Sequence, residues 1–193
     1  HAAHGDLLDK LRTSTSPGVA RILAYSLRES STRQFLLDLM AEREDVKTLG
    51  EIFNHLDFPV GLQVRENAAR IERFVWLDDS IMKSLKQLND HQKTIAMVLA
   101  TASKSLRSQV AELAQQMMNE SSESVQLAAC WAIERLPERY SNSLIQMALA
   151  SKHPTVVAKA TSLLQYLPSG DSESSLIEML DHEDEQVRHS AQE

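Results

Sequence analysis

The chain has 193 residues, which is enough for one sizeable domain or a short array of stacked units. Only 5 Gly and 5 Pro are present, so few residues are available for the turns of a β-sandwich or β-barrel. The 1 Cys excludes a disulfide scaffold and a Cys-rich zinc module. The 20 Lys and Arg against 27 Asp and Glu give a net charge of −7, the wrong sign for a dedicated nucleic-acid binder.

The apolar runs of the sequence are short. The longest uninterrupted apolar run, Leu127–Ile133, is far shorter than the roughly 20 residues of a membrane-spanning helix. No basic, then apolar, then small-residue segment opens the chain, so we expect no secretory signal and a cytoplasmic location. Residues 1–5 have the character of a cloning remnant or an internal cut, and we expect them to be disordered.

Apolar residues recur at helical spacing almost throughout the chain, and no segment shows strand alternation. Pro17 is a favourable first helical residue, and Pro59 marks the end of the fourth helix. The helices predicted in this part cover 6–11, 17–28, 30–40 and 49–56. Residues 6–58 are therefore predicted to be N-terminal helices that have diverged from the regular pattern that follows.

From residue 64 onward, a pair of apolar residues four positions apart returns at a regular interval. The first pair is Val64 and Ala68, and the successive steps are 31, 30, 31 and 31 residues. A period in this range is typical of a solenoid, in which each unit stacks on the next. The later pairs are Ile95 and Leu99, Val125 and Ala129, Val156 and Ala160, and Val187 and Ala191.

Further amphipathic helices lie between the helices that carry these apolar pairs, which we call the marked helices. The repeating unit is therefore a helix–turn–helix of about 31 residues. In the helix that contains Val125, Leu127 and Trp131 lie opposite the main apolar stripe, which indicates neighbours on two sides. We predict an all-α fold, a right-handed α-solenoid of stacked helical hairpins, whose array covers residues 59–193. The intervening helices are predicted over 81–88, 106–118, 143–149 and 176–180.

Four segments of the array share one sequence pattern. They are QVRENAARIERF at 63–74, SVQLAACWAIERLP at 124–137, PTVVAKATSLLQYLP at 154–168 and DEQVRHSAQ at 184–192. The pattern resembles HEAT repeats, particularly the short bacterial kind also found in phycobilin-lyase-type proteins. Its period is shorter than the ~40–47 residues of ordinary units, and Leu99 stands where Ala is expected. The resemblance implies stacked helices and a protein partner, but no chemistry.

The C-terminal end of the array departs from the repeat. The marked helices run on to Leu136 and Leu167, whereas the last one stops at Glu193, soon after Val187. It also lacks the polar outer face of a terminal capping repeat. We therefore expect the array to be truncated at its C-terminus and the chain to be a fragment of a longer protein, with fusion to another domain left open.

The sequence carries few patterns typical of catalytic or metal-binding sites. His182 and His189 form the best metal-like cluster, but on one helix they are ~10.5 Å apart along the axis, too far to share one ion without further ligands. Cys130 lies in the middle of a helix, where a buried, inert thiol is the usual state and a nucleophile is the alternative. We predict no catalytic residue, no cofactor and no metal.

The tryptophans and the charge distribution are the candidate partner-binding features. For Trp76 and Trp131, packing inside the array is the favoured interpretation and an exposed anchor is the alternative. Residues 81–111 carry five cations against Asp90 alone, and residues 170–193 carry eight acids against Arg188. Solvated faces are the favoured interpretation of both stretches, and binding to phosphates or a charged partner is the alternative.

These observations favour a non-catalytic protein–protein interaction scaffold, or an interaction or regulatory domain of a larger protein. The alternatives are an enzyme of the HEAT-like DNA glycosylase or bilin lyase type, and a structural module that stacks on copies of itself. The net charge counts against the glycosylase, so we expect a protein partner and no nucleic acid. The predicted binding surface follows successive inner helices and comprises Arg65, Lys93, Gln126, Trp131, Lys159 and Arg188.

Overall fold

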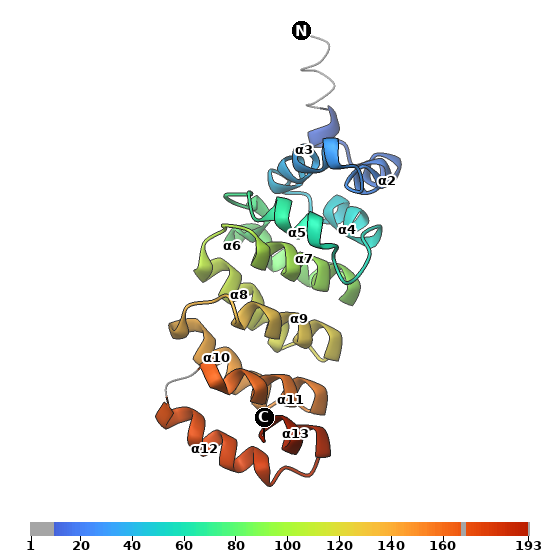
Figure 1. The fold of residues 1–193 in the computed structure, drawn as a ribbon. Helices are drawn as coiled ribbons and strands as arrows, with labels where there is room; N and C mark the ends of the chain where they lie inside the picture. Colours follow the sequence, from blue (N-terminus) through green and yellow to red (C-terminus); the bar gives the residue numbers. More distant parts are fainter. Residues whose placement is uncertain (1–9, 167–168, 193) are drawn as a thin grey trace. The chain divides into compact units, whose positions relative to one another are not determined.

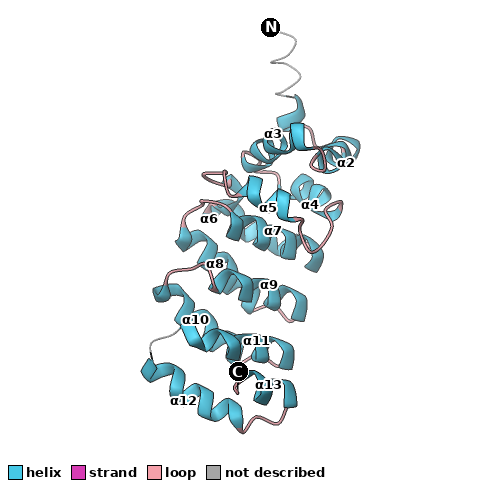
Figure 2. Ribbon diagram, viewed as in Figure 1, coloured by secondary structure: helices cyan, strands magenta, loops and turns pink. Residues whose placement is uncertain are grey.

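The computed structural model describes residues 10–166 and 169–192, and every regular element in these ranges is a helix (Figure 2). The expectations for residues 1–5 and for the start of the first helix lie outside the described residues. The chain divides into two compact units, up to Gln109 and from Val110, called here the N-terminal and C-terminal units. The sequence repeat predicts that the array starts at residue 59. The division into two compact units does not test this start, so it stays a prediction.

The N-terminal unit begins with the helices predicted from the sequence. Pro17 lies in the first turn of its helix, as expected, because its fixed φ suits that position. In packing, α2 contacts α4, α4 contacts α7, and α5 contacts both α3 and α7. The bounds are α2 Pro17–Ser26, α3 Ser30–Ala41, α4 Val46–Asn54, α5 Leu62–Ala68 and α7 Asp90–Ala102.

The single helix predicted over 81–88 is wrong. The structure has a short α-helix, α6 (Asp79–Met82), followed by a 3₁₀ helix at Lys83–Gln87. Met82, Leu85 and Leu88 are all buried, and they recur at every third position. This spacing matches the three residues per turn of a 3₁₀ helix, whereas an α-helix would rotate the third side chain away from the core.

The core of the N-terminal unit contains an aromatic cluster. Trp76 is fully buried, so the packing interpretation of this residue is confirmed. Its ring meets Phe53 edge-on at 6.1 Å and lies 4.7 Å from Phe74, between ring centroids. Such aromatic contacts add to the apolar area that the rings bury.

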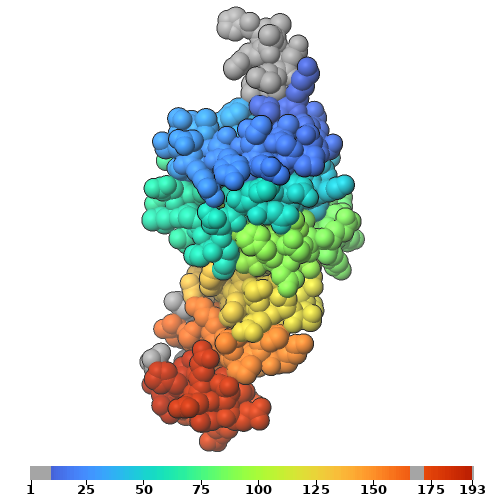
Figure 3. Space-filling view, turned by 90° about the vertical axis from the view of Figure 1, so that its right-hand side faces the viewer, coloured from blue at the N-terminus to red at the C-terminus, as the bar shows by residue number. Residues whose placement is uncertain are grey.

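The C-terminal unit is built from hairpins that repeat in order along the chain. In Figure 1, α9, α11 and α13 lie side by side, and α10 packs against both α9 and α11. The surfaces of these layers follow one another from yellow to red in Figure 3. The division between the units falls within α8. The bounds are α8 Arg107–Met118, α9 Glu123–Ile133, α10 Glu138–Leu149, α11 Pro154–Leu163, α12 Ser169–Leu180 and α13 Glu185–Ser190.

Most marker residues of the repeat are fully buried where adjacent helices meet. Val125, Val156 and Val187 each have 0% exposure, as do Ala129 and Ala160. A buried Val contributes roughly 1.5–3 kcal/mol relative to an exposed one, and Ala lets neighbouring helices approach closely. The prediction of an all-α solenoid of stacked hairpins is confirmed.

Candidate functional site

One face of the C-terminal unit exposes a large aromatic side chain. Trp131, on α9, is 39% exposed, and Leu127, one turn earlier on the same side, is half-buried. The opposite stripe of α9, which includes Val125 and Ala129, is fully buried. Part of the Trp131 side chain therefore lies at the surface of α9, while the rest is covered by neighbouring residues.

An ion pair joins the C-terminal end of α9 to α11. Lys159 Nζ lies 2.6 Å from Glu134 Oε1, with the two side chains 31% and 41% exposed. Glu134 follows Trp131 by three residues, and Ser162 follows Lys159 by three, so all four share one side of this helix pair. We call the surface of Leu127, Trp131, Glu134, Lys159 and Ser162 the α9–α11 face.

The single cysteine lies beneath this face. Cys130 is fully buried on α9. Burial raises the pKa of its thiol from 9.0 to about 12, while Lys159 lowers it and Glu134 raises it to smaller extents. Because a thiolate is the nucleophilic form, this thiol is unreactive near neutral pH, as the favoured interpretation had it.

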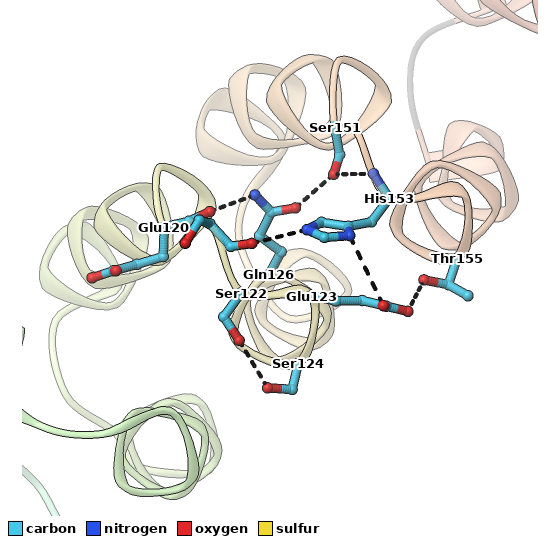
Figure 4. A network of polar contacts seen from close by, with 9 residues as sticks. Glu120, Ser122, Glu123, Ser124, Gln126, Ser151, His153 and Thr155 are labelled. Carbon is cyan, nitrogen blue, oxygen red and sulfur yellow. Dashed lines mark hydrogen bonds and ion pairs between the residues drawn. The ribbon is translucent and has the colours of Figure 1, made fainter.

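Gln126 lies inside the unit instead of on its surface, which corrects its assignment to a binding surface. The residue is 7% exposed, and its side chain forms hydrogen bonds with two backbone carbonyls and one hydroxyl. Its Nε2 donates to the carbonyls of Met118, at 3.1 Å, and Glu120, at 2.7 Å. Its Oε1 accepts a bond of 2.6 Å from Ser151 Oγ (Figure 4). A buried amide fully used in this way has a structural role.

His153 extends the same network along the turns that precede α9 and α11. Its ring Nε2 lies 3.0 Å from the carbonyl oxygen of Ser121, and its backbone N–H donates to Ser151 Oγ at 3.1 Å. Thr155 donates a hydroxyl bond to the carboxylate of Glu123 (Figure 4). Together these contacts fix the spacing of α9 and α11, and so the arrangement of the α9–α11 face.

The other predicted surface residues do not join this face. Arg65 is exposed on α5, in the N-terminal unit. Lys93 is only 8% exposed, because α7 is enclosed on almost every side from Gln92 to Ala102, so its expected surface position is wrong. Arg188 is half-buried, and its Nη1 donates to the carbonyls of His182 and Glu183 at 2.7 and 2.8 Å, which holds the turn before α13.

The basic stretch of the sequence does not form one continuous basic surface. Lys104 Nζ pairs with Glu72 Oε1 at 2.5 Å, and Arg107 Nη2 donates to the carbonyl of Ser103 at 2.6 Å. Lys93 is buried, which leaves Lys83 and Lys86 as the exposed cations of the stretch without a described ion pair. Nucleic-acid binding would need phosphate contacts from a shared face.

The residues considered for metal binding are also used internally. His182 Nδ1 accepts the backbone N–H of Asp184 at 3.0 Å. Within residues 10–166 and 169–192, no three His, Cys, Asp or Glu side chains are placed to hold one ion. In the same ranges no helix is long and apolar enough to cross a membrane.

The sequence interpretation missed exposed apolar side chains on other helices. Ile177 and Leu180, on α12, are 66% and 40% exposed, and Ile22 and Tyr25, on α2, are 63% and 57% exposed. Their spacing fits an amphipathic helix equally well in a buried or an exposed position. No signal in one sequence could have separated the two states, since exposure depends on which other helix covers the face.

Comparison with known protein families gives a match to the C-terminal unit. Residues 110–193 match a family model described as HEAT repeats, and this range begins where the C-terminal unit begins. No curated protein matches the chain.

Proposed function

Because residues 110–193 of this chain belong to the HEAT-repeat family, we propose that it is a protein-interaction scaffold without catalytic activity, or an interaction or regulatory domain of a larger protein. HEAT repeats commonly serve as protein-interaction scaffolds, and stacked repeats offer extended surfaces for this purpose. The proposed binding surface is the α9–α11 face, and the proposed partner is another protein.

The exposure of Trp131 is the observation that carries the proposal. Tryptophan, tyrosine and arginine dominate the binding energy of protein interfaces, and Trp131 presents 39% of its area at the surface of α9. Leu127 extends the apolar centre, while Glu134 and Lys159 supply a charged border. An apolar centre within a polar rim is the usual arrangement of a protein–protein interface.

The rigidity of the face supports the same conclusion. Gln126, Ser151 and His153 join the turns before α9 and α11, so the two helices are held in place before any partner arrives. A surface that is already ordered loses little conformational entropy on binding, which favours affinity.

The setting proposed for the scaffold is the cytoplasm. Its single cysteine is a buried thiol, so the protein has no need of an oxidising compartment.

The test is affinity capture from a lysate of the host cell, read by quantitative mass spectrometry over a salt series. Three baits are compared: the wild-type chain, Trp131→Ala, and Ile177→Ala as a control that removes an apolar side chain of 66% exposure from another helix of the same unit. Circular dichroism first establishes that all three baits are folded.

We expect one or a few proteins that the wild type and Ile177→Ala retain as salt rises and that Trp131→Ala loses. Equal recovery by all three baits would place the interface elsewhere. Recovery of nucleic acid alone, lost at moderate salt, would replace the scaffold with the glycosylase-type alternative. Recovery of the chain's own copies alone would favour the self-assembly alternative.

A further inference from the structure

The N-terminal unit contains a hollow of about 410 Å³ between α2, the end of α4 and the start of α5. This volume lies within the roughly 300–1,000 Å³ of small-molecule pockets. The lining mixes apolar side chains with a few polar ones, as such pockets usually do. It comprises Leu27, Arg28, Arg33, His55, Leu56, Asp57, Val60, Gly61, Leu62, Gln63 and Val64.

The apolar part of the lining has a buried wall and an open edge. Leu27, Leu56 and Val60 are 1%, 9% and 3% exposed, so they belong to the core of the unit. Leu62, in contrast, is 61% exposed. An alkyl group in the hollow would contact the buried wall and cover Leu62, removing apolar surface from water.

The polar part of the lining carries a positioned arginine. The guanidinium of Arg28 lies over the Tyr25 ring, 5.2 Å from its centroid, and Tyr25 in turn stacks on His55 at 6.4 Å. The described residues offer this guanidinium one carboxylate, that of Asp57, at 3.3 Å and with 84% exposure. Nη2 of Arg28 donates a hydrogen bond to this solvated carboxylate, and the other N–H groups of the guanidinium can meet a ligand.

A second guanidinium adds to the positive charge of the lining. Arg33 is 6% exposed, and it donates from Nε to the Leu27 carbonyl and from Nη2 to the Arg28 carbonyl, both at 2.7 Å. The lining therefore contains two arginine side chains and one carboxylate, that of Asp57. A lining with a net positive charge favours an anion over a cation.

We propose that this hollow binds a small amphiphilic anion, with a carboxylate or phosphate-monoester head on Arg28 and an alkyl part against Leu27, Leu56, Val60 and Leu62. Arg pairs with both heads through two parallel hydrogen bonds. The site is separate from the α9–α11 face and does not depend on the proposed scaffold function.

The experiment is an NMR titration of the full isotope-labelled chain, below the micelle concentration of each probe. Octanoate and octyl phosphate carry the proposed chemistry. Octan-1-ol keeps the tail without charge, octylamine reverses the charge, and acetate keeps the head without the tail. We expect shifts of the backbone amides of residues 27–28 and 55–64, and binding of octanoate or octyl phosphate at least about ten-fold tighter than that of the three control probes.

Two variants and one control locate the head and the tail. Arg28→Gln should weaken octanoate binding about ten-fold and leave octan-1-ol unchanged, since only the charged contact is lost. Leu62→Ser, at an exposed position, should weaken both. Arg70→Gln, at an exposed arginine outside the lining, should change neither.

Equal binding of octylamine and octanoate would overturn the proposal, as would shifts confined to other parts of the chain. If its spectrum shows that Arg28→Gln does not fold, Leu62→Ser and the comparison of the probes still test whether the hollow binds an amphiphilic anion. The relative affinities of octanoate and octyl phosphate then show which head the site prefers.

Discussion

The side-chain oxygen of Gln126 accepts a hydrogen bond of 2.6 Å from Ser151 Oγ, which joins the first turn of α9 to the turn before α11. The amide nitrogen of the same side chain holds two carbonyls of the preceding turn. One buried glutamine thus connects two successive repeats, and the order of the α9–α11 face depends on it.

Gln126→Ala should lower the free energy of unfolding of the C-terminal unit by about 2–3 kcal/mol, because it removes three hydrogen bonds and leaves their partners inside. Urea unfolding followed by circular dichroism measures the change. Gln146→Ala, at an exposed position of α10, is the matched control and should cost less than about 0.5 kcal/mol. Equal costs for the two variants would show that the network adds nothing to stability.

The two tryptophans should differ sharply in their contribution to stability. Trp76→Ala removes a fully buried ring and should cost about 3–5 kcal/mol in its own unit. Trp131→Ala removes a ring that is 39% exposed and should cost less than about 2 kcal/mol. Urea unfolding curves of the two variants and the wild type provide the measurement. A cost for Trp131→Ala as large as that for Trp76→Ala would make Trp131 a core residue and remove it from the proposed interface.

Cys130 should make stability depend on pH in the alkaline range. The folded chain keeps the thiol proton up to about pH 12, whereas the unfolded chain loses it near 9.0, so ionisation favours the unfolded state as pH rises between these values. The contribution of Cys130 is fully present below pH 9 and falls by up to about 1.4 kcal/mol per pH unit above it. Cys130→Ala should lack this loss.

Urea unfolding of the wild type and Cys130→Ala at pH 8 and pH 10 tests this prediction, since all other titrating groups are common to both chains. We expect the wild type to lose about 1.4 kcal/mol more than the variant between the two pH values. An identical loss would mean that the thiol ionises as readily in the folded chain as in the unfolded one.

Leu149 and Leu180 hold equivalent positions, at the ends of α10 and α12, but they differ in burial. Leu149 packs against the cluster of Val157, Met179 and Val187, whereas Leu180 is 40% exposed. We expect Leu149→Ala to cost about 2 kcal/mol and Leu180→Ala less than about 1 kcal/mol in urea unfolding. The reverse order would contradict the packing of the layers described above.

The regular part of the fold could be predicted because repetition multiplies a weak signal. Val125, Val156 and Val187 are each an ordinary apolar residue, but their common interval indicates one position in successive units, and all three are fully buried. The start of α10 at Glu138, five residues before the predicted 143, was not visible, since the first turns of an exposed helix carry little apolar pattern.

The positions of the polar candidates could not be predicted in the same way. Lys93 and Gln126 have side chains that usually face water, yet both are buried, because the helices that carry them are covered on several sides. Periodicity tells which side of a helix faces the core, but not how many other helices surround it. The exposure of Trp131 depends in the same way on the helices around α9.

The central claim is that the α9–α11 face contacts a protein partner, and site-specific photo-crosslinking in the host cell tests it most directly. The photoreactive residue p-benzoylphenylalanine replaces Ser162, which holds on α11 the position that Trp131 holds on α9, and in a control it replaces the exposed Gln146. The account predicts a light-dependent adduct with another protein at 162, none at 146, and loss of the adduct in the Trp131→Ala background. Equal adducts at both positions, or none at 162, would contradict it.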